Sequence, residues 1–197
     1  MKKFPKILLV RKRAPIRASL LLARRTRRNL VPRKQLRILL ALLMATSYDN
    51  DTTNCDEYGG LYQWSEMMQL PSRCNTESCA DLIKPNHQGI CPDGWRLLTE
   101  DDFYVVLHAN DVGAKGVRAT SFGGLNYSGY SLIGAGYNWV HEFRRLKESS
   151  YWFYPVEESE DSEMGALAGY QTKSLTSSGS QYTYKTQGFS VRCVMVK

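Results

Sequence analysis

Residues 91–107 read CPDGWRLLTEDDFYVVL, and residues 188–196 near the C-terminus read GFSVRCVMV. In the first stretch, a cysteine and a turn precede a helix. Thr99 is a suitable N-cap for this helix, and Asp102 completes an approximate capping box. The second stretch is typical of a strand and carries another cysteine. Together they indicate a secreted, disulfide-closed binding module rather than an ordinary cytosolic domain.

Several strands are expected in the second half of the chain. In the last one, apolar side chains occupy every second position, which predicts one buried face. Its apolar positions are Phe189, Val191, Cys193 and Met195, with Ser190 and Arg192 between them. Other short strands or loop edges are expected at residues 130–139, 149–155, 166–172 and 181–186.

Two helices are expected from apolar residues at helical spacing. The first lies within residues 58–70, ends before Pro71, and contributes Trp and Met side chains to the core. The second begins after Thr99 and stops near Asn110. Their inward-facing residues are Leu61, Trp64, Ser65 and Met68 in the first, and Phe103, Val106 and Leu107 in the second.

The formal net charge of +7 hides two regions of opposite charge. Residues 1–47 hold 14 Lys or Arg and no acid. Residues 48–197 hold 12 Lys or Arg against all 19 Asp and Glu, a net charge of −7. The composition therefore predicts a basic arm over residues 1–46, disordered or forming a short helix, and an acidic domain over residues 47–197.

Three interpretations of the basic arm stay open. It can attach to an anionic surface, and it is the one part of the chain that offers membrane association. Nucleic acid is disfavoured, because no aromatic residue is interleaved with the arginines and no recognition fold follows. The arm can instead be a targeting segment, although the apolar stretch 7–10 is short for a signal peptide and 36–45 lies far from the start. It can also be an incorrectly assigned start, which the abrupt composition change at residues 44–48 supports.

No catalytic or cofactor-binding constellation stands out, and we expect neither a cofactor nor a metal. The three histidines are isolated and the cysteines form no CxxC pair, which disfavours zinc. Residues 47–54 lack the glycine and glutamate of an EF-hand, so we expect a solvated loop there. Acids at residues 100–102 fit the dipole at a helix start. Residues 157–163, EESEDSE, are expected to form an acidic surface loop.

Five cysteines allow two disulfides. Cys74 and Cys79 can join locally. Cys91 can join Cys193 across a loop of about a hundred residues, which contributes about 4 kcal/mol in the chain-entropy account. Cys55 is then left as a candidate free thiol. Disulfides indicate an oxidising location, which is extracellular, at the cell surface or periplasmic.

Ordered sequence blocks over residues 47–197 resemble the Fibrobacter succinogenes major paralogous domain family. These blocks are NCDEYGGLYQW (54–64), CPDGWRLLTEDDF (91–103), YSLIGAGY (130–137), SSYWFYP (149–155) and GFSVRCV (188–194). The chain departs from the family pattern at Gly60, Arg96, Leu98 and Phe103. It also lacks a cysteine near Ser47, which explains why Cys55 has no partner, and the basic arm replaces a typical upstream strand.

The resemblance implies a secreted or surface-attached bacterial protein with an α+β fold. Its blocks are similar to those of C-type lectin-like and formylglycine-generating-enzyme folds. The expected architecture is a small twisted antiparallel sheet with about two helices and long loops. Such a likeness does not establish function. The calcium-dependent sugar motifs of C-type lectins and the reactive cysteine pair of formylglycine chemistry are both missing from the sequence.

The leading functional hypothesis is a noncatalytic extracellular binding or surface module. Loops between residues 122 and 186 present Tyr, Trp, Ser, Gly and Asn, which also dominate paratopes. The ligand is unknown, with a polysaccharide or an envelope protein as the candidates. A structural envelope component is the alternative, and an enzyme of unknown reaction is the weakest hypothesis. The candidate ligand contacts are Tyr151, Tyr154, Tyr170, Tyr182 and Tyr184, whereas Trp139 and Trp152 are each expected in the core.

Overall fold

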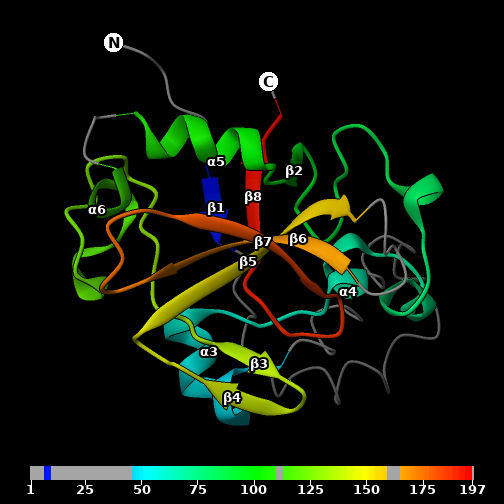
Figure 1. Ribbon diagram of the computed structural model, residues 1–197, viewed down its shortest axis with the longest axis horizontal. Helices are drawn as coiled ribbons and strands as arrows, with labels where there is room; N and C mark the ends of the chain where they lie inside the picture. Colours follow the sequence, from blue (N-terminus) through cyan, green and yellow to red (C-terminus); the bar gives the residue numbers. More distant parts are fainter. Residues whose placement is uncertain (1–6, 10–45, 110–112, 159–164, 197) are drawn as a thin grey trace, which may run out of the picture.

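The computed structural model describes residues 7–9, 46–109, 113–158 and 165–196, which form a mixed α+β fold with small antiparallel sheets (Figure 1). The helices are α3 (Thr52–Tyr58), α4 (Trp64–Met68), α5 (Glu100–Leu107) and α6 (Gly113–Val117), with 3-10 turns at Tyr48–Asn50, Ser72–Asn75, Ala80–Leu82 and Thr120–Phe122. The strands are β1 (Ile7–Leu9), β2 (Trp95–Leu97), β3 (Tyr137–Trp139), β4 (Glu142–Arg144), β5 (Ser149–Glu157), β6 (Gly165–Thr172), β7 (Gly179–Tyr184) and β8 (Arg192–Met195).

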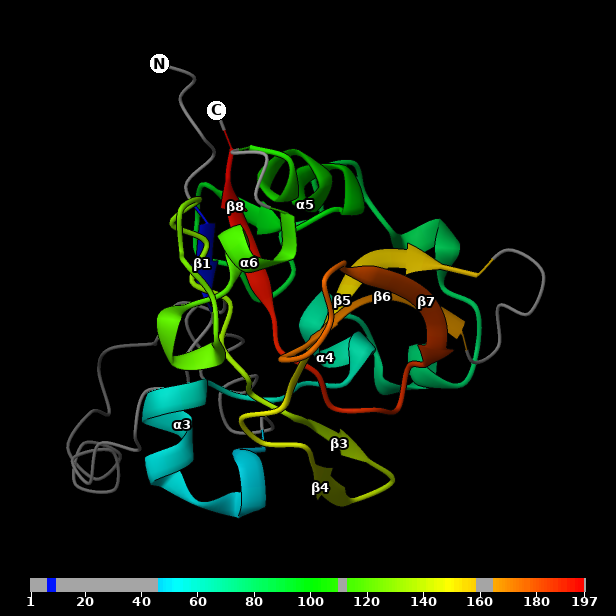
Figure 2. The same cartoon turned by 60° about the vertical axis from the view of Figure 1, so that its left-hand side comes forward.

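The longest strands form the antiparallel sheet β5-β6-β7. It lies between α5 at one end of the domain and the β3–β4 hairpin at the other (Figure 1 and Figure 2). Close packing within the sheet requires glycine at position 169, because a Cβ atom there would lie 2.4 Å from the Trp152 ring. Strand β7 pairs with β6 alone among the described residues, so its outer edge stays open.

A second sheet has the order β1-β8-β2, with both pairings antiparallel. Cys193 in β8 lies opposite Leu8 of β1 and Leu97 of β2. We expected the basic arm to be disordered or a short helix, and this is wrong for Ile7–Leu9, which form a strand beside β8. Thr46 at the end of the arm pairs with Leu61, and the other residues of the arm lie outside the described residues.

The expectation of one buried face in the last strand is also wrong. Residues 189–194 are all buried, including the polar Ser190 and Arg192, whereas Met195 is 37% exposed. The reason is tertiary, because β8 is a central strand with packing on both faces. Phe189, Val191 and Cys193 belong to the core cluster around Trp64. Val194 belongs to the core cluster around Phe103 and Trp152.

Helix α4 is shorter than the helix expected over residues 58–70, and residues 59–63 are extended. The main chain of Tyr62 exchanges two hydrogen bonds with Phe189, with N–O distances of 2.8 and 3.0 Å. This pairing competes with helix formation, and two glycines at positions 59 and 60 favour the extended course. The expected burial of Trp64 and Met68 is confirmed.

Helix α5 begins as its sequence predicts. The Thr99 hydroxyl accepts a hydrogen bond from the Asp102 N–H, and the Asp102 carboxylate accepts one from the Thr99 N–H. The two reciprocal bonds form the expected capping box. Phe103 and Val106 are buried, and the helix ends at Leu107, slightly before the predicted stop.

The region before α4 is more ordered than the solvated loop expected at residues 47–54. A 3-10 turn leads into α3, which Asp51 caps by accepting a hydrogen bond from the Thr53 N–H at 2.8 Å. Cys55 is buried in α3 as a free thiol, and its Sγ contacts the hydroxyl of the buried Ser47. The family resemblance places a cysteine near Ser47, and Ser47 does contact Cys55 in the structure.

Two disulfides are present, Cys74–Cys79 and Cys91–Cys193, and both pairings are those that the sequence suggests. Disulfides form and persist in oxidising compartments, which supports a location outside the reducing cytosol. In the described part of the chain, no helix is both long and apolar enough to span a membrane.

The two disulfides should contribute unequally to stability. Cys91 and Cys193 are 102 residues apart, whereas Cys74 and Cys79 are 5 apart. In the chain-entropy account, the longer loop corresponds to about 4–5 kcal/mol and the shorter to about 2 kcal/mol. We expect the C91A/C193A variant to lose more free energy of unfolding than C74A/C79A, measured by denaturant titration. A larger loss for C74A/C79A would contradict this order.

Asp102 should make the fold sensitive to acid. Burial alone would raise its pKa, but hydrogen bonds from Arg96 and Thr99 outweigh that effect and hold the pKa below its ordinary value. A carboxyl whose pKa is lowered by folding stabilises the fold fully above its unfolded pKa of about 3.9, and this stabilisation is lost as the pH falls further. We expect D102N to flatten the acid limb of the stability curve, measured by urea denaturation across the acid range. D101N, which changes an exposed acid in the same helical turn, should leave that limb unchanged.

Candidate ligand-binding surface

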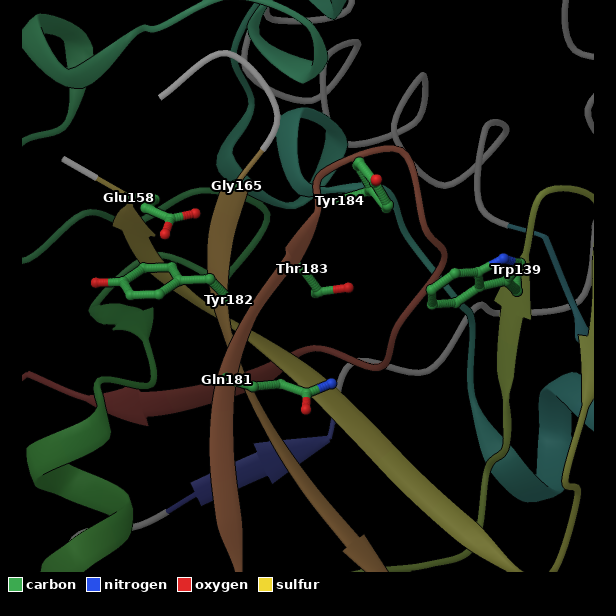
Figure 3. A pocket seen from close by; sticks show the side chains of 7 residues that line it. All are labelled: Trp139, Glu158, Gly165, Gln181, Tyr182, Thr183 and Tyr184. Carbon is green, nitrogen blue, oxygen red and sulfur yellow. The ribbon is translucent and has the colours of Figure 1, made fainter. Parts of the chain in front are cut away.

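A depression of about 390 Å³ lies beside the edge strand β7 (Figure 3). Aromatic rings, uncharged polar groups and one carboxylate border it within the described residues. Sites for organic ligands commonly combine apolar or aromatic walls with a few polar groups that orient the ligand. The residues that line the depression are Trp139, Glu158, Gly165, Gln181, Tyr182, Thr183 and Tyr184.

Strand β7 supplies most of this lining because it is an edge strand. Successive side chains of a strand point to opposite faces, so Tyr182 and Thr183 leave β7 on different sides. In Figure 3, Tyr182 lies toward Glu158, and Thr183 points toward the side where Trp139 lies. Tyr182 is 46% exposed and Tyr184 is 50% exposed, although both are large aromatic side chains. No further strand covers them among the described residues, so their rings are accessible to a ligand.

Trp139 reaches the depression from the β3–β4 hairpin, far from β7 in the sequence. Two main-chain hydrogen bonds of 2.9 Å between Asn138 and Gly188 attach the hairpin to the segment that follows β7. The Trp139 and Tyr184 rings meet edge to face, with centroids 6.4 Å apart and planes at 81°. This aromatic pair therefore depends on tertiary contacts rather than on neighbouring sequence.

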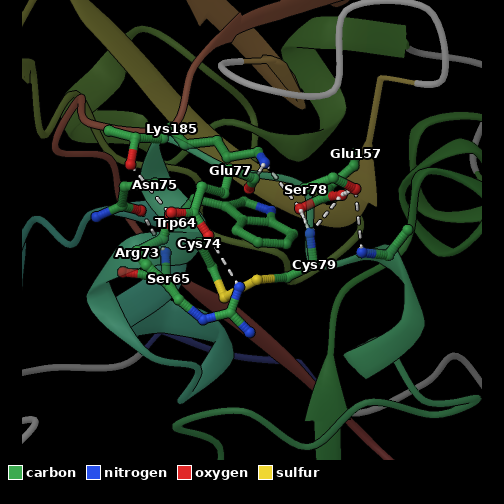
Figure 4. A network of polar contacts seen from close by, with 12 residues as sticks. Trp64, Ser65, Arg73, Cys74, Asn75, Glu77, Ser78, Cys79, Glu157 and Lys185 are labelled. Atoms are coloured by element: carbon green, nitrogen blue, oxygen red, sulfur yellow. Dashed lines mark hydrogen bonds and ion pairs between the residues drawn. A yellow bond between two sulfur atoms is a disulfide. The ribbon is translucent and has the colours of Figure 1, made fainter.

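A buried ion pair joins Glu157 and Lys185, which are the chain neighbours of two lining residues (Figure 4). Lys185 Nζ lies 2.7 Å from Glu157 Oε1, and the two side chains are 0% and 4% exposed. Lys185 also donates to the Glu77 carbonyl at 3.1 Å, and its ammonium lies 5.0 Å from the centroid of the Trp64 ring. Since Glu157 precedes Glu158 and Lys185 follows Tyr184, the pair ties together two sides of the depression.

The same carboxylate holds the small disulfide loop. Glu157 accepts hydrogen bonds from the Ser78 hydroxyl at 3.0 Å and from the Cys79 N–H at 3.0 and 3.1 Å (Figure 4). We expected residue 157 to begin an acidic surface loop, and this is wrong for Glu157 itself. Its charge is buried because a lysine and a main-chain N–H compensate it. The rest of that loop after residue 158 lies outside the described residues.

The five candidate tyrosines have different environments. Tyr182 and Tyr184 line the depression, whereas Tyr151 and Tyr170 stack on each other, half-buried, with centroids 5.7 Å apart. Tyr154 is not available to a ligand, because its side chain is 1% exposed and burial raises the pKa of its hydroxyl. The apolar core around it therefore rules out the predicted surface contact for Tyr154.

Other lining residues were missed or misjudged at the level of sequence. Trp152 is buried as expected, but Trp139 is only partly buried and lines the depression. Glu158, Gln181 and Thr183 were not among the candidates. The alternation of tyrosine with polar residues in β7 is the one local signal that could have indicated Gln181 and Thr183.

Residues 37–195 match the model of the Fibrobacter succinogenes major domain. The chain belongs to this family. The match includes both disulfides, Cys55 and the residues that line the depression. The comparisons with curated proteins and with solved structures found no match. Membership in the Fibrobacter succinogenes major domain family therefore rests on the family match, and the depression is described from this structure alone.

Loss of the buried cation should destabilise the domain. We expect K185M to lower the free energy of unfolding by about 3–5 kcal/mol, because the Glu157 carboxylate would stay buried without its ammonium partner. Urea denaturation measures this change. R144M is the matched control, since Arg144 forms an exposed ion pair with Glu142, and such pairs contribute little. Equal effects of the two substitutions would contradict a special role for the buried pair.

Proposed function

We propose that this domain is a noncatalytic extracellular binding module, and that the depression beside β7 is its contact surface. The observation that carries the proposal is the partial exposure of two aromatic side chains of the edge strand β7, Tyr182 and Tyr184, of which Tyr184 meets Trp139 edge to face. Tyr and Trp combine a large apolar area with a polar group, and they are enriched where proteins bind ligands.

The composition of the surface supports a role in binding rather than turnover. Most glycoside hydrolases act with two carboxylates on either side of the bond that is broken. Glu158 is the one acid among the described lining residues, and they include no histidine or cysteine. The described lining can orient a ligand, and it contains no pair of carboxylates of the kind that most glycoside hydrolases use.

The two disulfides support a place outside the cytosol, at the cell surface, in the periplasm or in the medium. We further propose that the fold has a C-type lectin-like arrangement. Its supports are the disulfide from Cys91, which precedes β2, to Cys193 in β8, and the long connections around small antiparallel sheets. The alternative is a structural component of the envelope, for which the same surface would contact protein partners. Binding to bacterial envelope fragments tests this alternative.

The tyrosines should carry the binding. We expect Y182A/Y184A to weaken attachment of the full chain, with both disulfides formed, at least tenfold, since loss of buried aromatic contacts typically costs more than 1 kcal/mol each. The measurement is co-sedimentation with insoluble polysaccharides and with bacterial envelope fragments. Thermal unfolding of each variant establishes that the fold is retained.

Tyr127 gives a matched control, because it is 62% exposed and does not line the depression. Y127A should bind as the unchanged chain does. Equal binding by Y182A/Y184A would show that the contact surface lies elsewhere. Release of reducing sugar from a bound polysaccharide would contradict the noncatalytic part of the proposal.

A further inference from the structure

We infer that the depression beside β7 takes a neutral glycan chain and selects against glycans that carry carboxylate or sulfate groups. This inference rests on the proposed function, because it names the ligand class of the same surface. Three features carry it: accessible aromatic rings, uncharged hydrogen-bonding side chains, and a local charge that is negative.

The aromatic rings provide apolar surface for sugar rings. Pyranose rings present C–H groups on their faces and hydroxyls at their edges, so they can pack on an aromatic face while remaining hydrated elsewhere. Tyr182 and Tyr184 combine such a face with a hydroxyl at the tip, which suits a ligand of mixed polarity. The edge-to-face contact of Trp139 with Tyr184 holds the two rings in fixed relative orientation.

Uncharged polar side chains line the depression together with these rings. Gln181 can donate and accept through its amide, and Thr183 can do both through its hydroxyl. Neither side chain forms a hydrogen bond to another described residue, although both line the depression. Sugar hydroxyls are likewise donors and acceptors, so a neutral glycan can satisfy both groups without an accompanying charge.

The charge near the depression opposes anionic ligands. Glu158 contributes a carboxylate to the lining, and residues 48–197 carry a net charge of −7. Lys185, which follows Tyr184, is fully buried and paired with Glu157, so its charge is already compensated. A uronate or sulfate group on the ligand would therefore meet a like charge, which weakens association.

An extended peptide is the other occupant that the open edge of β7 would accept. Strand addition gains its affinity from main-chain groups, with side-chain pockets giving specificity. It requires no aromatic rings beside the edge. The aromatic lining, which comprises Tyr182 and the Trp139–Tyr184 pair, would then have no explanation, and this favours the glycan.

The test uses neutral oligosaccharides and their charged counterparts. Xylohexaose, cellohexaose and laminarihexaose are compared with oligogalacturonate and oligoalginate of similar length, with isothermal titration calorimetry on the full chain. The basic arm can bind uronates by charge alone. For this reason, only binding that is lost in Y182A/Y184A and kept in Y127A is assigned to the depression.

We expect at least one neutral oligosaccharide to bind and to lose at least tenfold in affinity in Y182A/Y184A. Tyrosine-dependent binding of the uronates should be at least tenfold weaker than that of the neutral oligosaccharide. E158Q removes the negative charge of the lining and should reduce this difference in affinity. Uronates that bind through the tyrosines as tightly as neutral chains would overturn the inference.

The remaining outcomes separate this inference from the proposed function. Tyrosine-dependent binding to envelope fragments that protease treatment abolishes would identify a peptide occupant, which overturns the glycan and leaves the binding module intact. Absence of any tyrosine-dependent binding, to glycans or to envelope fragments, would overturn both.

Discussion

Cys193 holds strand β8 in the middle of the domain. It is bonded to Cys91 and lies opposite both β1 and β2, while neighbouring residues of the strand pack into two separate core clusters. The loop that this disulfide closes contains every element from β2 to β7. All described residues that line the depression therefore lie between the two ends of one covalent constraint, which limits the conformations of the unfolded chain.

The buried ion pair of Glu157 and Lys185 lies next to the candidate surface in the sequence, because Glu158 and Tyr184 line the depression. Buried ion pairs gain little net stability, because desolvation offsets their attraction, but loss of one partner is costly. Here the carboxylate also fixes the loop closed by Cys74 and Cys79. The pair thus connects the end of β5, the residue that follows β7, and a disulfide loop.

Local sequence predicted the elements whose determinants are local. The capping box of Thr99 and Asp102 uses residues three apart, and the strands expected at residues 149–155, 166–172 and 181–186 correspond to β5, β6 and β7. The predictions failed where distant segments compete. Tyr62 pairs with Phe189 instead of joining a helix, and Ser190 and Arg192 are buried because the last strand is central. The local sequence pattern reveals neither the pairing of Tyr62 with Phe189 nor the packing on both faces of the last strand.

The same distinction applies to the candidate site. The amino-acid sequence by itself indicated the family, suggested both disulfide pairings and the free Cys55, predicted the start of α5, and included both tyrosines that line the depression among its candidates. Tertiary structure alone decided that Tyr154 is buried and that Trp139 contacts Tyr184. It also decided that Glu157, the first residue of an acidic run, is buried in an ion pair with Lys185. Periodicity and spacing describe contacts within a few residues, whereas burial and charge pairing depend on segments that folding brings together.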